Sequence, residues 1–115
     1  MNTKEYLEKL EQTPELLEFS ELMDVIESEY NFTPSDFKNG DLESLENENM
    51  GSCKIFSFGQ LHGLTAEQTL ACFGAYYRND VLQNPDGEDH QNIRNFMQTG
   101  WNGVVFSQTA LADKS

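Results

Sequence analysis

A chain of 115 residues fits one small domain with a single core and is too short for two independent ones. Eight Phe, four Tyr and one Trp supply large apolar surfaces that disordered chains lack, so we expect a globular fold. With 20 acidic and 7 basic side chains the formal net charge is −13, which argues against binding to nucleic-acid phosphates or anionic lipid.

The N-terminal part predicts two amphipathic helices. A short helix begins at Thr3, and a longer one begins at Thr13-Pro14, where threonine can cap the helix and proline fits the first helical position. The longer helix runs for about four turns, because apolar residues recur at spacings of three and four. These residues are Leu16, Phe19, Leu22, Met23, Ile26 and Tyr30.

The next segment predicts less structure. Thr33-Pro34 repeats the same start signal, but Asn39-Gly40 ends the predicted helix within about a turn and a half. The stretch DLESLENENM, residues 41–50, has no clear periodicity, so we expect an acidic loop there.

Two further helix starts follow in the middle of the chain. Ser52 is a suitable cap for a helix from Cys53 to about His62, which the following glycine is placed to end. Thr65 and Gln68 match a capping box for a second helix over residues 65–82. Its expected inward positions are Leu70, Phe73, Gly74, Tyr77 and Val81.

The C-terminal part begins with a turn at residues 84–87, NPDG. Asp89 can cap a last helix that Gly100 ends, and WNGVVF, residues 101–106, predicts a short extended segment. The predicted fold is therefore mainly α: a compact single-domain bundle of about five to six short helices, with a small β element near the C-terminus.

We expect residues 1–115 to form this one domain, as a monomer. The helix within residues 1–12 is expected at its periphery, and residues 107–115 as a flexible tail.

The acidic residues are concentrated in the first half of the chain. Residues 1–50 contain 14 acidic and 3 basic side chains, whereas residues 51–115 contain 6 and 4. Such a charge either keeps an aromatic-rich protein in solution, mimics the phosphates of DNA, or attracts a basic partner. Among binding partners we expect a protein, with basic character, before a nucleic acid.

The sequence contains no apolar run of about 18 residues, and the start MNTKEYLEKLEQ has neither a basic leader nor an apolar core. We therefore expect no membrane span and no general secretory signal peptide. A cytoplasmic chain keeps its cysteines reduced, so Cys53 and Cys72 are expected to be free thiols.

Cys53 is the best candidate for a catalytic residue. At a predicted helix N-terminus and beside Lys54, its thiolate would be stabilised and its pKa lowered. The base would be His90, brought in by folding and oriented by Asp89 or Asn92. The alternative is that Cys53 is a small core residue. Because no complete catalytic motif is present, we favour a protein that is not an enzyme.

Four side chains have the chemistry of zinc ligands, but their spacings of nine, ten and eighteen residues match no compact zinc motif. They are Cys53, His62, Cys72 and His90. We therefore expect no metal and no cofactor.

A candidate binding surface lies around the start of the last predicted helix, where charged, amide and aromatic side chains are dense. It comprises Asp89, His90, Asn92, Arg94 and Trp101. The structural alternative is that Asp89 caps the helix, Arg94 pairs with an acidic helix and Trp101 fills the core.

Three stretches of the sequence resemble the HopJ family of type III effector proteins. They are YNFTPSDFKNGD at 30–41, the stretch from NMGSCKIF to AYYR at 49–78, and PDGEDHQNIRNFMQTGWNGVVF at 85–106. The resemblance implies a small bacterial protein of a family named from members that plant pathogens inject into host cells, where they act in virulence. It implies no reaction, cofactor or catalytic residue.

Three functions therefore stay open. The leading hypothesis is a non-enzymatic, HopJ-like interaction protein that uses its acidic half or the Asp89 to Trp101 surface. The alternatives are a small hydrolase or transferase that uses Cys53 and His90, and a module that binds a small ligand between aromatic side chains.

Overall fold

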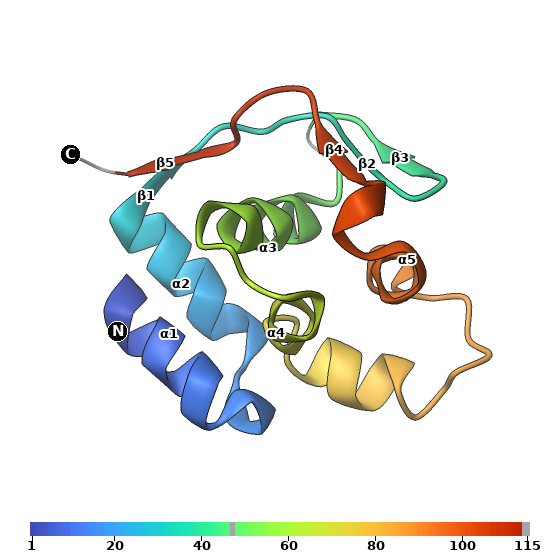
Figure 1. Cartoon of the computed structure of the whole chain (residues 1–115), viewed down its shortest axis with the longest axis horizontal. Helices are drawn as coiled ribbons and strands as arrows, with labels where there is room; N and C mark the ends of the chain where they lie inside the picture. Colours follow the sequence, from blue (N-terminus) through green and yellow to red (C-terminus); the bar gives the residue numbers. More distant parts are fainter. Residues whose placement is uncertain (47, 114–115) are drawn as a thin grey trace.

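Helices form most of the chain in the computed structural model, which describes residues 1–46 and 48–113. The helical segments are α1 (Thr3–Gln12), η1 (Pro14–Leu16), α2 (Phe19–Glu29), α3 (Met50–Leu61), α4 (Ala66–Ala71), η2 (Tyr76–Val81), α5 (Gln91–Thr99) and η3 (Gly100–Gly103). Of these, η1 and η3 are 3-10 helices and η2 is a π-helix. Figure 1 shows α1 and α2 side by side at one end of the molecule, with α5 at the other.

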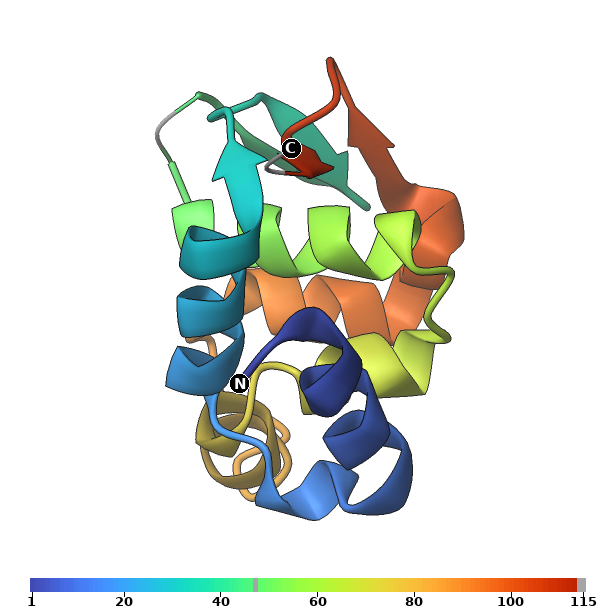
Figure 2. The ribbon, with the colours of Figure 1, turned by 90° about the vertical axis from the view of Figure 1, so that its left-hand side faces the viewer.

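Short strands pair in two antiparallel sheets. They are β1 (Tyr30–Phe32), β2 (Phe37–Asn39), β3 (Leu42–Ser44), β4 (Val104–Phe106) and β5 (Leu111–Asp113). One sheet has the order β3-β2-β4 with Phe37 opposite Phe106, and the other pairs β1 with β5. In Figures 1 and 2 both sheets lie along one side of α3, and α4 lies on the other side.

The core is centred on α3, whose Ile55, Phe56 and Phe58 are fully buried. Phe56 packs against aromatic rings from four other segments: Phe37, Phe73, Phe96 and Trp101. All residues from Ile55 to Gly59 are buried, so successive faces of α3 are covered, as is typical of a helix between layers. The strands on one side and α4 on the other provide those layers.

Several sequence predictions are confirmed. A helix does begin at Thr3, and Gly100 follows the last residue of α5. The capping box at α4 is present, because the Thr65 hydroxyl accepts from the Gln68 amide at 3.1 Å and the Gln68 side chain accepts from the Thr65 amide at 3.0 Å. The C-terminal β element is β4.

The predicted mainly helical bundle with a small β element is confirmed only in part, because short strands in two sheets make the fold mixed α/β. Residues 33–40, expected as a short helix, instead contain β2, and the expected acidic loop contains β3. The Ser35 hydroxyl donates to the Thr33 carbonyl at 2.9 Å, which favours a local turn rather than a helix start. Pairing with β4, about seventy residues away, then fixes β2 as the central strand.

The long helix predicted over residues 65–82 is broken. α4 ends at Ala71, and Gly74 adopts φ +63 before the chain continues into η2. A Cβ at Gly74 would lie 2.8 Å from the Phe19 backbone nitrogen, so the backbone before α2 occupies the space beside this glycine. The long helix predicted from Thr13-Pro14 is also divided. The 3-10 helix η1 forms at Pro14–Leu16, and α2 begins only at Phe19.

Two predicted caps are wrong. Ser52 lies inside α3, which begins at Met50 with Asn49 as its N-terminal cap residue. Asp89 does not cap α5 either, since His90 occupies that position. Both cap residues have left-handed backbone conformations, whereas a capping serine or aspartate is typically extended.

The two chain ends are more tightly attached than expected. Tyr6 and Leu10 bury α1 against the rest of the molecule, with exposed fractions of 0% and 2%. Within the expected flexible tail, Leu111–Asp113 forms β5 and pairs with β1. Residues 114 and 115 lie outside the described part of the chain.

Candidate binding site

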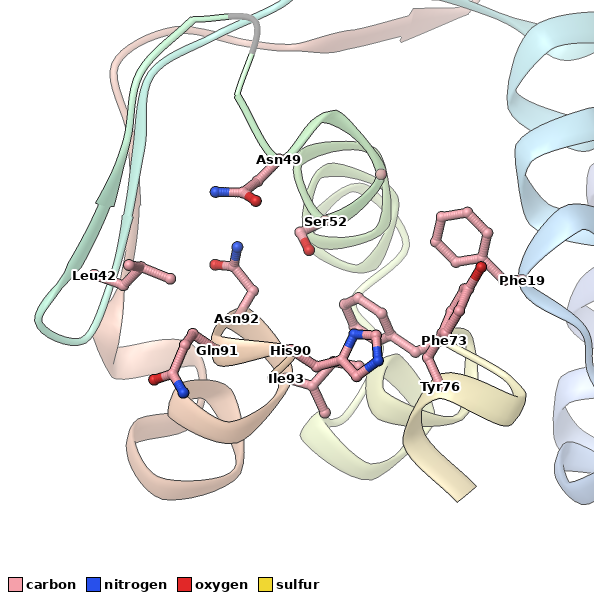
Figure 3. Close-up of a pocket in the computed structure, with 11 residues that line it drawn as sticks. Phe19, Leu42, Asn49, Ser52, Phe73, Tyr76, His90, Gln91, Asn92 and Ile93 are labelled. Atoms are coloured by element: carbon pink, nitrogen blue, oxygen red, sulfur yellow. The ribbon is translucent and has the colours of Figure 1, made fainter. Parts of the chain in front are cut away.

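A cleft of about 670 Å³ opens between the first turns of α3 and α5. Figure 3 shows polar side chains from these two helices on one side of it and aromatic rings on the other. The lining comprises Phe19, Leu42, Asn49, Gly51, Ser52, Phe73, Tyr76, His90, Gln91, Asn92 and Ile93. Its dimensions are those of sites that take small molecules.

The N-terminal cap residues of α3 and α5 have an unusual backbone conformation. Asn49 has φ 49 and His90 has φ 50, and these are the non-glycine residues with positive φ in the described part of the chain. Such a conformation costs of order 1 kcal/mol or more for a residue with a side chain. Neither side chain caps its own helix. The first amide groups of α3 and α5 are therefore left without the usual side-chain acceptor.

Asn92 links the cleft to the sheet. Asn39 of β2 donates from Nδ2 to the Asn92 backbone carbonyl at 2.7 Å and to Asn92 Oδ1 at 3.1 Å. Asn95 in turn donates to the Asn39 carbonyl at 3.1 Å. Asn39 is fully buried and Asn92 is 5% exposed, so these amides fix the first turn of α5 against β2.

No carboxylate is among the described residues that line the cleft, although the chain contains 20 acidic side chains. Two carboxylates lie next to it. Asp80 Oδ2 is 3.0 Å and Asp89 Oδ2 is 3.8 Å from His90 Nε2, so the histidine ring is held by acidic residues outside the lining. Tyr76 packs beside the same ring, with 5.2 Å between centroids.

Arg94 has a structural role next to the cleft. Its guanidinium donates to Asp89 Oδ1 at 2.6 Å and to the carbonyls of Asp89 and Asn84. The hydrogen bonds and charge from Arg94 lower the pKa of the exposed Asp89 carboxyl. Arg94 therefore closes the loop before α5 rather than pairing with an acidic helix.

Trp101 is partly buried and packs against the core. Its ring lies edge-on to Phe96 at 5.0 Å and to Phe56 at 6.3 Å, and its Nε1 donates to the Leu64 carbonyl at 2.9 Å. A Cβ at Gly59 would lie 2.8 Å from this ring, so the glycine allows the indole to reach α3. The structure brings Asp89, His90 and Arg94 together, but it turns Asn92 toward β2 and places Trp101 among aromatic rings.

The thiol of Cys53 is in the core, with an exposed fraction of 1%. Burial raises its pKa, and the nearby Lys54 only reduces that effect. The hydrogen-bond contact of Cys53 Sγ is the Ser35 carbonyl at 3.9 Å, whereas the His90 ring bonds to Asp80. This environment is the opposite of the exposed, activated thiolate that a cysteine nucleophile needs.

The remaining candidate ligands also have local partners. His62 Nε2 lies 2.7 Å from the Tyr30 hydroxyl, and burial lowers the pKa of this histidine. Cys72 is buried, with its pKa raised to about 11 by burial. In residues 1–46 and 48–113 no group of three or more metal-ligating side chains gathers at one point.

The outer surface of α1, η1 and α2 is rich in carboxylates. Its exposed acidic side chains, called here the acidic N-terminal surface, are Glu5, Glu8, Glu11, Glu15, Glu18, Asp24 and Glu27. Two ion pairs lie beside it: Lys9 with Glu21 at 2.7 Å and Arg78 with Glu18 at 3.5 Å. Together with the exposed Lys4 of α1, these cations are fewer than the carboxylates of this surface.

Sequence reasoning missed most of the cleft. It singled out His90 and Asn92, but not Asn49, Ser52 or Tyr76, because these residues lie in segments that only the fold brings together. Asn49 offered one local signal, since asparagine tolerates the left-handed conformation better than most residues.

None of the helices in the described ranges is long and apolar enough to cross a membrane.

The fold and the cleft define a small acidic α/β protein with a cleft framed by two helix N-termini and aromatic rings. The family model of the HopJ type III effector proteins matches residues 3–111, so the chain belongs to this family. It is also similar to the crystal structure of VPA0580, a protein of unknown function. The two share 54% sequence identity and a TM-score of 0.97, over 99% of this chain and 95% of that chain. A search of curated proteins finds no match.

Proposed function

We propose that this HopJ-family protein is a non-enzymatic interaction protein that binds a basic protein partner through its acidic N-terminal surface. The observation that supports this proposal is the exposure of the carboxylates on α1, η1 and α2 with few cations beside them. Complementary charge accelerates encounter and selects partners of the opposite sign.

The position of α1 favours such a role. Tyr6 and Leu10 attach the helix firmly to the core, so the carboxylates on its outer face are presented by a rigid element. A rigid surface loses little conformational entropy on binding, which increases the affinity that charge attraction can give.

The experiment compares two variants that remove the same charge from different places. Glu8→Gln/Glu11→Gln/Glu15→Gln neutralises part of the acidic N-terminal surface. Asp41→Asn/Glu43→Gln/Glu46→Gln neutralises three exposed carboxylates of the β2-β3 hairpin and the chain after it. Each triple variant changes the net charge from −13 to −10.

Partners are captured from host-cell extract by immobilised protein at low and at high salt. We expect a basic protein that the wild type and the hairpin variant retain at low salt, and that the α1 variant loses. Equal loss in both variants would mean attraction to net charge alone and would contradict a defined surface. Recovery of no basic protein at low salt, where charges are least screened, would also contradict the proposal.

Delivery into a host cell by a type III system is part of the same proposal and is supported by family membership. A translocation reporter fused to the C-terminus is expected to enter host cells from bacteria with a functional type III apparatus. Entry that is equal from an apparatus-deficient strain, or no entry from either, would contradict delivery by this route.

The alternative of a cysteine-dependent hydrolase or transferase is less well supported. It requires an accessible Cys53 thiolate with His90 as its base. The burial of Cys53, its raised pKa and the engagement of His90 by Asp80 all oppose that arrangement. The alternative of a ligand-binding module gains support from the cleft between α3 and α5.

A further inference from the structure

We propose that the cleft between the N-termini of α3 and α5 binds a small organic anion, with its phosphate or carboxylate oxygens at the two helix ends and its apolar body against Phe19, Phe73 and Tyr76. This inference goes beyond the partner surface proposed above and is independent of it, because it concerns other residues and a ligand of opposite charge.

The helix ends supply the first set of donors. The first backbone hydrogen bond at the start of α3 is from the Cys53 amide to the Asn49 carbonyl, so the amides of Met50, Gly51 and Ser52 precede the helical ladder. In α5 the ladder begins with the Ile93 amide, which donates to the His90 carbonyl at 3.0 Å. Residues of both first turns line the same cleft. Two sets of free amides and the positive ends of two helix dipoles therefore converge on one space.

The side-chain amide of Asn92 adds a donor to the same space. The residue has an exposed fraction of 5%, and it lines the cleft. Only the Nδ2 group of Asn39 can donate to the Asn92 backbone carbonyl, and the same group faces Asn92 Oδ1. The orientation of the Asn92 amide is thereby fixed, with its nitrogen on the side away from Asn39.

That nitrogen has no hydrogen-bond partner among residues 1–46 and 48–113. Figure 3 shows it directed toward Asn49 and Ser52 across the cleft, and the Ser52 hydroxyl points into the same space. Because this nitrogen is not one of the fully buried polar atoms that lack a partner, it is open to the cleft and can donate to an acceptor there. An anionic oxygen between Ser52 and Asn92 would accept from both and from the free backbone amides.

The apolar side of the cleft indicates what the rest of the ligand is like. The rings of Phe19 and Tyr76 meet edge to face with centroids 5.2 Å apart, and Phe73 and Ile93 continue the surface. A Cβ at Gly51 would lie 2.6 Å from the Phe19 ring, so this glycine lets the aromatic wall approach the end of α3 closely. A planar or aromatic group is suited to such a surface.

The charges around the site favour an anion over a cation. Carboxylates are missing from the described lining. Asp80 and Asp89 beside it are engaged by His90 and Arg94, and the Glu48 carboxylate accepts from the Leu45 amide. Because His90 Nε2 is occupied by Asp80, the proposal assigns the anion to the backbone amides, Ser52 and Asn92 rather than to a histidine charge.

The test uses phenyl phosphate, inorganic phosphate and phenol as probes, with binding followed by backbone amide NMR shifts of the full chain. We expect phenyl phosphate to shift the amides of residues 49–52 and 90–93 in a saturable way. Inorganic phosphate should shift the same amides with about tenfold weaker affinity, and phenol should leave them almost unchanged.

Two variants test the assigned donors. Ser52→Asp places a carboxylate at the first turn of α3, where it stabilises the helix while repelling an anion, so the fold should be kept and affinity for phenyl phosphate should fall at least tenfold. Asn92→Asp keeps the oxygen that Asn39 needs and replaces the free donor, with the same expected loss. Ser20→Asp, in the first turn of α2 and outside the cleft lining, should change affinity less than about twofold.

Four results would overturn the proposal. They are the absence of shifts at the two helix starts, phenol binding as tightly as phenyl phosphate, inorganic phosphate binding as tightly as phenyl phosphate, and unchanged affinity in a folded Ser52→Asp variant. Failure to capture a basic partner would contradict only the partner surface, and absence of phenyl phosphate binding would contradict only this cleft site, so the two proposals fail separately.

Discussion

The Tyr6 hydroxyl and the Cys72 thiol lie together in the core, where α1 meets α4. Burial raises the pKa of Cys72 from 9.0 to about 11 and also raises the pKa of Tyr6. Both groups are therefore held in their neutral forms in the folded protein. Cysteine in this chain acts as a small apolar side chain, as does the buried Cys53.

This burial predicts a loss of stability at alkaline pH. The unfolded chain releases the Cys72 proton near pH 9, whereas the folded protein keeps it until about pH 11. The contribution is therefore complete below pH 9 and is lost as pH rises toward 11, by roughly 2 to 3 kcal/mol from this thiol. Urea unfolding measured across that range should show the decline, and Cys72→Ala should make it shallower. A free energy of unfolding that stays constant up to pH 11 would contradict the assigned burial.

Among the elements, the break between α4 and η2 depends on one glycine. Gly74 combines φ +63 with a position where a Cβ would lie 2.8 Å from the Phe19 backbone nitrogen. The Arg78 guanidinium reinforces the junction by donating to the Leu17 carbonyl at 2.7 Å. The contact fixes the chain before α2 against the segment between α4 and η2; Phe73 of the cleft belongs to that segment, and Tyr76 follows it as the first residue of η2.

Gly74→Ala should therefore destabilise the protein strongly, and Gly63→Ala provides the matched control. Gly63 has the same φ of +63, but a Cβ there meets no atom within 4 Å. We expect about 1 kcal/mol of destabilisation at Gly63 from backbone strain alone, and at least about 2 kcal/mol more at Gly74 from the clash. Equal melting temperatures for the two variants would show that the backbone contact at Gly74 is absent.

The elements that sequence patterns predict correctly are those whose signals are local. Thr65 and Gln68 form their capping box within four residues, and Gly100 ends α5 as expected. By contrast, β2 depends on Phe37 pairing with Phe106, a contact between distant segments that no local pattern encodes. Thr33-Pro34 therefore gave a false helix signal, because the pairing overrode the local preference.

The candidate site was predictable only in part for the same reason. His90 and Asn92 stood out because they lie in a dense polar segment, but the cleft also needs Asn49 and Ser52 from a helix start forty residues earlier. The expected cap at Ser52 was wrong because Asn49 starts α3 in a left-handed conformation. Trp101 and Arg94 were expected either in a binding surface or in structural roles, and their contacts assign Trp101 to packing and Arg94 to loop closure.

For the whole molecule, the net charge of −13 imposes a repulsion that the folded state must withstand. The acidic side chains are mostly exposed, and the ion pairs Lys9–Glu21 and Arg78–Glu18 offset little of the total. Charge repulsion over longer distances is sensitive to salt, whereas the close pairs are weak contributors to stability.

Moderate salt should therefore stabilise the protein. Raising NaCl from about 0.01 M to about 0.15 M shortens the Debye length from about 30 Å to about 8 Å, so the melting temperature is expected to rise by several degrees. The triple variant with Glu8, Glu11 and Glu15 changed to Gln should show a smaller increase, because it contains less charge to screen. A melting temperature that falls with added salt would mean that ion pairs, rather than repulsion, dominate the electrostatics.

The measurement that separates recognition from catalysis most directly is the rate of Cys53 alkylation in the native protein as a function of pH. Cys53→Ala serves as the control, because it leaves Cys72 as the remaining thiol. A buried thiol with a raised pKa is expected to react only as fast as the protein opens, with no fast phase near neutral pH. A fast reaction of the folded protein, with an apparent pKa below the ordinary value of about 8.5, would contradict the structural role of Cys53 and restore the case for an enzyme.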